Sequence, residues 1–148
     1  LGKLARQLRM LGFDALYQND WSQNQLRAIA RDQKRIILTR NARLARHPEV
    51  ARACQIRSEA PWQQLIEVIQ RFDLREQIHP LSRCLQCNTP VAPISPESAA
   101  ERVPQKVKTR FNAFWTCPSC GRVYWKGSHY RAMIEQIHQS LGIRLKPE

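Results

Sequence analysis

The sequence predicts an α/β protein: a parallel sheet flanked by helices, followed by a small four-cysteine ribbon and a C-terminal helix. In the first half, amphipathic helical patterns alternate with short apolar runs, an order typical of βα units and a parallel sheet. From about residue 79, prolines and two CxxC pairs replace this alternation. We therefore expect an α/β domain over residues 1–78 and a ribbon with its helix over residues 79–148.

The helices of the first domain are predicted from their apolar faces and their end signals. Leucines at helical spacing open the chain, and Gly12 is the stop signal. Ser22 and Gln25 have the spacing of a capping box, which predicts a second helix. Asn41 is placed to cap a short third helix. Residues 61–72 carry an apolar face at helical spacing and predict a fourth.

The strands are predicted from short apolar runs between these helices. Residues 35–39 are rich in β-branched side chains, the pattern of a buried parallel strand. Residues 13–17 and 54–57 are the other candidate strands, and we expect Cys54 to be a small buried apolar residue. In the second domain, residues 129–141 predict the C-terminal helix.

Charge limits the partners. The chain has 148 residues, of which 43% are hydrophobic, and a net charge of +12. Residues 1–57 hold twelve Lys and Arg against four acidic residues, and residues 82–148 hold ten against four. Basic blocks of this size attract polyanions, so RNA or a ribonucleoprotein is the predicted partner.

The cellular setting is predicted from what the sequence lacks. No apolar run approaches the roughly 20 residues that span a bilayer. The start of the chain alternates basic and apolar residues, unlike a signal peptide. Cysteines arranged for metal binding suit a reducing compartment. We therefore expect a cytoplasmic protein without a membrane segment.

Cys84, Cys87, Cys117 and Cys120 are the predicted metal ligands. Each CxxC turn directs two thiolates at one centre, and two such turns make a tetrahedral four-sulfur site. Zinc is the predicted ion, although iron also accepts this geometry. With four cysteines no coordination position stays open for water, so the predicted role is structural rather than catalytic.

Aromatic and basic residues interleave around the second cysteine pair. Two interpretations are open: a stacking platform for unpaired bases beside phosphate-binding cations, or the small core of the ribbon. We expect most of the rings to be core and one or two to be exposed. The aromatic residues are Phe111, Phe114, Trp115, Tyr124, Trp125 and Tyr130.

Four stretches of the chain resemble the Mut-seven C-terminal RNase-type family. They are LGKLARQLRMLGFD at 1–14, RIILTRN at 35–41, RCLQCN at 83–88 and FWTCPSCGRVYWKGSH at 114–129. The resemblance implies a PIN-like domain followed by a zinc ribbon. It also implies metal-dependent RNA cleavage by carboxylates that gather Mg²⁺ or Mn²⁺, ions that activate water and stabilise charge on the scissile phosphate.

The sequence departs from the acidic pattern that this resemblance implies. One acid is expected on a first strand before the LGKLAR helix, so we expect that strand to precede Leu1. Two others are expected where this chain has Gln23 and Asn41. An Asn caps a helix as well as an Asp but brings no charge to a divalent cation. Asp14 and Asp20 remain as candidate catalytic residues.

Three functions are compatible with these observations: a ribonuclease with a degenerate acidic site, a non-catalytic RNA- or ribosome-binding protein, and a DNA-binding zinc-ribbon regulator. The last lacks a helix-turn-helix signature. Replacing carboxylates in a basic cleft favours phosphate binding, so RNA binding is the predicted function. The candidate nucleic-acid contacts are Lys3, Arg6, Arg9, Arg40, Arg43, Arg46 and Lys126.

Overall fold

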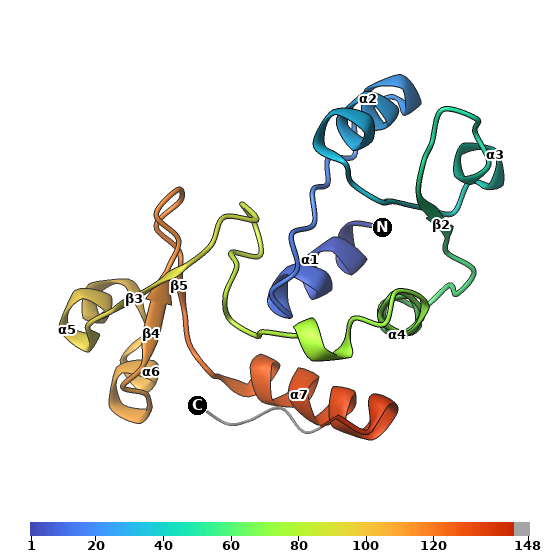
Figure 1. The fold of residues 1–148 in the computed structure, drawn as a ribbon. Helices are drawn as coiled ribbons and strands as arrows, with labels where there is room; N and C mark the ends of the chain where they lie inside the picture. The colour runs from blue at the N-terminus through green and yellow to red at the C-terminus, as the bar shows by residue number, and fades with distance from the viewer. Residues whose placement is uncertain (144–148) are drawn as a thin grey trace. The chain divides into compact units, whose positions relative to one another are not determined.

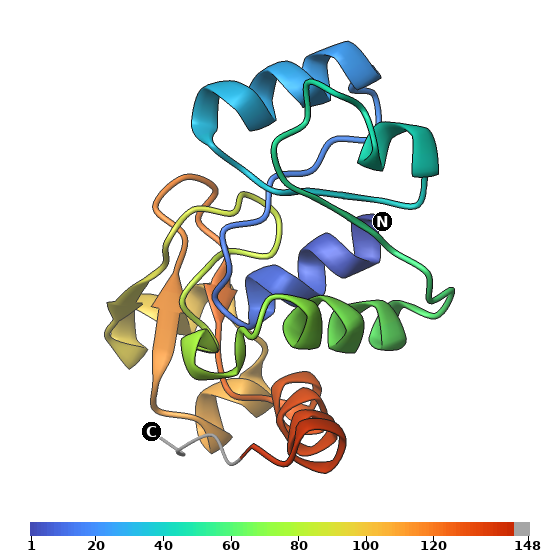
Figure 2. The same ribbon diagram turned by 45° about the vertical axis from the view of Figure 1, so that its right-hand side comes forward.

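A computed structural model describes residues 1–143 of the chain (Figures 1 and 2). Its contacts divide the chain into two compact units. Unit 1 consists of Leu1–Ala5 and Leu16–Leu74, and unit 2 of Arg6–Ala15 and Arg75–Glu148. Helix α1 (Gly2–Met10) contributes to both. Residues 6–15 therefore group with the cysteine-rich second part of the chain. The predicted domain division instead places them in the first domain.

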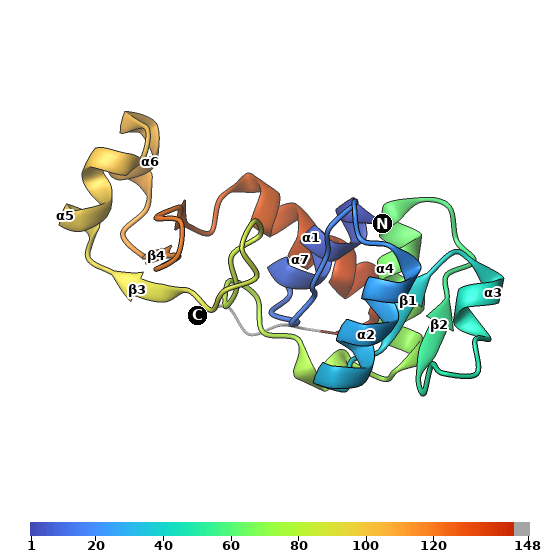
Figure 3. The same cartoon turned by 90° about the horizontal axis from the view of Figure 1, so that it is seen from above.

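Unit 1 contains a small parallel sheet with helices (Figure 3). Strands β1 (Ile37–Thr39) and β2 (Ala53–Gln55) pair in parallel, with Leu38 opposite Cys54. Helix α3 (Ala42–Ala45) connects them, giving the predicted βαβ order on a short scale. Cys54 is buried, as predicted. The PIN-like arrangement as a whole stays a prediction.

The helix ends of unit 1 follow the predicted capping signals. Helix α2 (Gln23–Gln33) begins after Ser22, which forms the full capping box with Gln25. Asn41 caps α3 by accepting the backbone N–H groups of Arg43 and Leu44. These caps satisfy N–H groups that have no partner within the helix. The predicted fourth helix is α4 (Pro61–Arg71), whose buried residues are Gln64, Leu65, Val68 and Ile69.

Unit 2 contains an antiparallel sheet in the order β3–β4–β5 (Figure 1). The strands are β3 (Ala92–Ile94), β4 (Phe114–Thr116) and β5 (Val123–Tyr124). Between β3 and β4 the chain forms α5 (Pro96–Ala99), the 3-10 helix η2 (Ala100–Arg102) and α6 (Gln105–Arg110). A further 3-10 helix, η1 (Arg75–Gln77), begins the second stretch of the unit. The predicted C-terminal helix is α7 (Ser128–Leu141), which ends at Gly142 in the left-handed conformation.

The core of the ribbon lies on one face of this sheet. Phe114 packs with Ala99 and Val103 in a buried cluster, and Phe111 and Trp125 pack against it. Phe114 and Trp125 meet edge to face with ring centroids 6.4 Å apart. Burying these side chains lets α5, η2 and α6 cover the sheet.

The predicted strand over residues 13–17 is wrong. These residues form no regular strand. The backbone groups of Ala15 bond to side chains instead: its N–H donates to Oδ1 of Asn88, and Nε of Arg9 donates to its carbonyl. A partner 73 residues away along the chain and one six residues away replace the sheet ladder that the local sequence indicated.

Within residues 1–143, no helix has both the length and the apolar composition that crossing a membrane requires.

Candidate metal centre and basic surface

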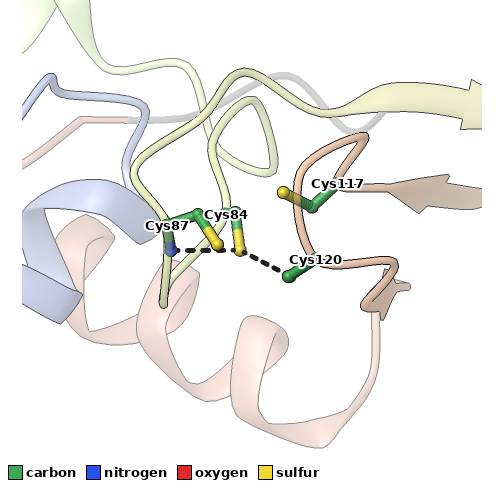
Figure 4. A group of neighbouring side chains, drawn as sticks. All are labelled: Cys84, Cys87, Cys117 and Cys120. Atoms are coloured by element: carbon green, nitrogen blue, oxygen red, sulfur yellow. Dashed lines mark hydrogen bonds between the residues drawn. The ribbon is translucent and has the colours of Figure 1, made fainter.

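Four cysteine sulfurs converge in unit 2 (Figure 4). Cys84 and Cys87 lie on one turn, and Cys117 and Cys120 lie on the turn between β4 and β5. All four Sγ atoms lie within 4.8 Å of one another, and those of Cys84 and Cys120 are 3.7 Å apart. A tetrahedron with metal–sulfur bonds of ~2.3 Å has an edge of about 3.8 Å. The donor set therefore fits a tetrahedral thiolate-bound metal.

The two turns have the same backbone geometry. In the first, Asn88 donates its N–H to the carbonyl of Cys84 at 3.0 Å; in the second, Gly121 donates to that of Cys117 at 2.8 Å. Both Asn88 and Gly121 follow a second cysteine and have positive φ, 62° and 78°. Glycine adopts this conformation without strain, and asparagine tolerates it better than most residues. Each CxxC sequence therefore closes a knuckle that points its sulfurs inward.

Tyr124 supports the centre from β5. Its hydroxyl accepts the N–H of Leu85 at 3.1 Å and lies 3.0 Å from Sγ of Cys84. Leu85 is the donor in the first bond. When Cys84 is a thiolate it has no proton to donate, so the hydroxyl is then the donor to the sulfur. A hydrogen bond of this kind orients a thiolate ligand and moderates its charge. No local sequence signal indicates this role, because Tyr124 lies 40 residues from Cys84.

The thiol pKa values show how closely the sulfurs interact. A hydrogen bond from the backbone of Arg122 lowers the pKa of Cys120 to about 6. A hydrogen bond to Cys120 raises the pKa of Cys87 to about 12. Protons are thus shared unevenly among neighbouring thiols. Because metal ligands have to be thiolates, binding a divalent cation at this cluster displaces those protons.

The first knuckle also binds the segment that follows α1. The guanidinium of Arg9 donates to the carbonyls of Ala15 and Leu85, each at 2.8 Å. Nδ2 of Asn88 donates to Oδ1 of Asp14. All of these residues belong to unit 2. Asn88 thus holds the left-handed position of the knuckle while its side chain anchors Asp14.

The predicted phosphate-contacting residues fall into four groups. Lys3, Arg6, Arg43 and Arg46 are exposed. Arg40 is exposed but donates to the carbonyl of Ser58 at 2.6 Å. Arg9 is buried, with 8% of its surface exposed, and its guanidinium is engaged with backbone carbonyls. Lys126, the candidate in the ribbon, is half-buried beside two aromatic rings.

Asn41 and Glu67 define the chemistry at the carboxyl ends of β1 and β2. The side chain of Asn41 is used as the cap of α3. Both carboxylate oxygens of Glu67 accept the N–H of Arg57, and Oε1 also accepts that of Ser58, just beyond β2. Burial alone would raise the pKa of Glu67, but these hydrogen bonds outweigh it and lower the pKa. Glu67 was not among the predicted site residues.

The remaining acidic candidates do not gather into a metal site. Asp14 and Asp20 are exposed, and Gln23 is the first residue of α2. Within residues 1–143, the four cysteines are the one group of three or more His, Cys, Asp or Glu side chains close enough to hold a metal. Within the described residues the predicted structural ligands therefore come together, and their group contains neither of the predicted catalytic acids.

The fold and this site define a mixed α/β protein with a cluster of four cysteines that could hold a metal ion. The chain belongs to the Mut7-C RNAse domain family, whose model matches residues 1–137. The match includes the α/β unit, both knuckles and most of α7, and it confirms the family that the sequence motifs indicated. No curated protein and no solved structure showed a significant match.

Proposed function

We propose that this protein binds RNA through its basic surfaces and that its four cysteines hold a structural zinc ion. Membership in an RNase domain family supports RNA as the ligand. Four thiolates in a closed tetrahedral arrangement favour zinc and leave no open coordination position for catalysis. The first unit is proposed to be PIN-like, in keeping with its parallel βαβ segment.

The observation that carries this proposal is the chemistry at the ends of β1 and β2. A nuclease site needs several carboxylates with free oxygens around one or two divalent ions. Here Asn41 supplies a neutral amide that is already used as a helix cap. Glu67 binds backbone N–H groups with both oxygens. Exposed cations such as Arg43 and Arg46 follow Asn41, and they attract a phosphate backbone.

Metal-dependent RNA cleavage is the second candidate, and the family assignment favours it. Asp14 and Asp20 are the carboxylates proposed to serve it, with Mg²⁺ or Mn²⁺ as the ion. Their exposure leaves them accessible to a hydrated cation. A ribonuclease of this kind would still have to gather them around one centre.

The test is a mobility-shift and cleavage assay on labelled single-stranded and hairpin RNA. Full-length protein is incubated with Mn²⁺, Mg²⁺ or EDTA, and its zinc content is measured afterwards so that loss of the structural ion is recognised. We expect a salt-sensitive shift and intact RNA in every condition. Cleavage that requires Mn²⁺ or Mg²⁺ and is lost in Asp20→Ala would support the enzyme instead. If the protein neither shifts nor cleaves the RNA, then RNA is not its ligand.

A further inference from the structure

The aromatic residues of the ribbon separate into three groups by their contacts. Phe111, Phe114 and Trp125 belong to the buried cluster on one face of the sheet. Tyr124 serves the cysteine centre through its hydroxyl. The two rings outside both groups, Trp115 and Tyr130, both lie near the ammonium group of Lys126.

The strand register explains why Trp115 is not part of the core. Side chains alternate between the faces of a strand, so Trp115 points away from the face that its neighbour Phe114 occupies. Directly paired residues of antiparallel strands share a face, which places Trp115 with its partners Pro93 and Tyr124. Its side chain is half-buried, so part of the ring is open to solvent.

Lys126 joins the two rings. Its Nζ lies 6.0 Å from the centroid of Trp115 and 5.8 Å from that of Tyr130. Contact with two aromatic faces fixes the position of a side chain that is usually mobile. The result is a cation close to two aromatic rings, an arrangement that matches a nucleotide with its base and its phosphate.

The stretch of sequence that contains these residues carries charge of one sign. From Arg102 to Ile134 the sequence has no Asp or Glu, and it has seven Lys or Arg residues. Neither of the ion pairs found within residues 1–143 involves any of the seven. A positive, acid-free segment with a partly open indole favours a polyanion that also offers flat rings to stack.

We propose that Trp115, Lys126 and Tyr130 form a binding site for unpaired nucleotides of single-stranded RNA. This inference rests on the proposed RNA-binding function and assigns it to a particular face of the ribbon. A base stacks on the indole of Trp115, and Lys126 contacts the adjoining phosphate. Paired bases do not offer a free face, so single strands bind here in preference to duplex.

The test measures the affinity of the full-length, zinc-loaded protein for a fluorescein-labelled uridine decamer and for an RNA duplex. We expect Trp115→Ala to weaken decamer binding about 10-fold and Trp115→Phe to weaken it less. Lys126→Gln should reduce the slope of log affinity against log salt by about one. Arg75→Gln, which removes an exposed charge elsewhere in unit 2, serves as the matched control for Lys126→Gln and should leave this slope unchanged.

A measurement on the unchanged protein guards against misfolded variants. Ultraviolet crosslinking to the decamer, followed by tryptic digestion, should place RNA adducts on peptides 111–122 and 127–131. Decamer binding with wild-type affinity in both Trp115→Ala and Lys126→Gln, or adducts confined to other peptides, would overturn this site and leave the proposed function standing. Failure of the wild-type protein to bind any RNA would instead overturn the proposed function, and this site with it.

Discussion

Nδ2 of Asn88 donates a hydrogen bond to Oδ1 of Asp14, 74 residues earlier in the chain. The same Asn88 side chain accepts the N–H of Ala15 at 3.0 Å, and Asn88 holds the left-handed position of the first knuckle. Gly121 occupies the equivalent place in the second knuckle, where no such docking is needed. The cysteine centre is thus continuous with the segment that carries a candidate catalytic acid.

Replacing Asn88 with glycine separates these two roles. Asn88→Gly keeps a residue that adopts positive φ, so the knuckle and its metal affinity should be retained. The bonds to Asp14 and Ala15 are lost, which should destabilise unit 2 by about 1–2 kcal/mol. Thermal unfolding and zinc titration measure the two effects. A loss of zinc affinity in Asn88→Gly as large as the loss of stability would mean that docking and metal binding are not separable.

Removing the metal should release the docked segment as well as the ribbon. Metal binding at such a site is part of the folding free energy, so chelation unfolds the knuckles. The amides of Ala15 and His79, which bond to Asn88 and Leu11, should then lose hydrogen-exchange protection. The amide of Ile56, bonded to Thr39 within unit 1, is the internal control. Retained protection at Ala15 after chelation would contradict this coupling.

Arg9 should matter for stability rather than for RNA affinity. Its buried guanidinium satisfies three backbone carbonyls, of Ala15, Leu85 and Gln86. Arg9→Met leaves these acceptors without a donor and should cost about 2–4 kcal/mol. The exposed Arg6, one turn earlier, is the matched control: Arg6→Gln should change the free energy of unfolding by less than about 0.5 kcal/mol. Denaturant unfolding of both variants provides the comparison.

Tyr124→Phe should weaken the metal centre without disturbing the sheet. The change removes only the hydroxyl that bonds to Sγ of Cys84 and to the N–H of Leu85. Loss of such a supporting bond typically lowers metal affinity about 10-fold or more. Cobalt substitution gives a direct readout, because the thiolate-to-metal absorption should shift. Unchanged affinity and an unchanged spectrum would mean that the hydroxyl does not act on the bound sulfur.

Much of the secondary structure could be predicted because its signals are local. Ser22 and Asn41 each begin a helix, and Gly142 ends one, through contacts within a few residues. Both CxxC motifs likewise specify their own turns. The error at residues 13–17 has the opposite cause, because Asp14 and Ala15 bond to Asn88, more than 70 residues away. Likewise, a stripe of Lys3, Arg6 and Arg9 at spacing three does not reveal that its last member is buried. Which aromatic rings pack in the core and which stay partly exposed depends on strand register, and the composition of the segment does not reveal that register.

Glu67 should make stability depend on pH in a defined window. Its pKa is lower in the folded protein than in the unfolded chain, so its contribution is present above the unfolded value of about 4.3 and is lost as pH falls through the folded value. Glu67→Gln should therefore cost about 1 kcal/mol at pH 7, discounted for partial exposure, and nothing once the carboxylate is protonated. Urea unfolding at pH 7 and at pH 3 gives the comparison, with Glu59→Gln as an exposed control. An equal loss at both pH values would assign the effect to shape rather than charge.

Asn41→Asp tests whether a single restored acid changes the chemistry at the end of β1. Aspartate caps a helix as well as asparagine, and its charge suits the N-terminus of α3, so stability should change by less than about 0.5 kcal/mol. The new charge opposes phosphate, so RNA binding should weaken and its dependence on salt should become less steep. We expect no Mn²⁺-dependent cleavage, because both oxygens of Glu67 already accept backbone N–H groups and one carboxylate does not assemble a metal site. Gln63→Glu, in the exposed first turn of α4, is the matched charge control. Cleavage gained by Asn41→Asp but not by Gln63→Glu would mean that the remaining carboxylates are poised around this position, and that asparagine alone keeps the fold from acting as a nuclease.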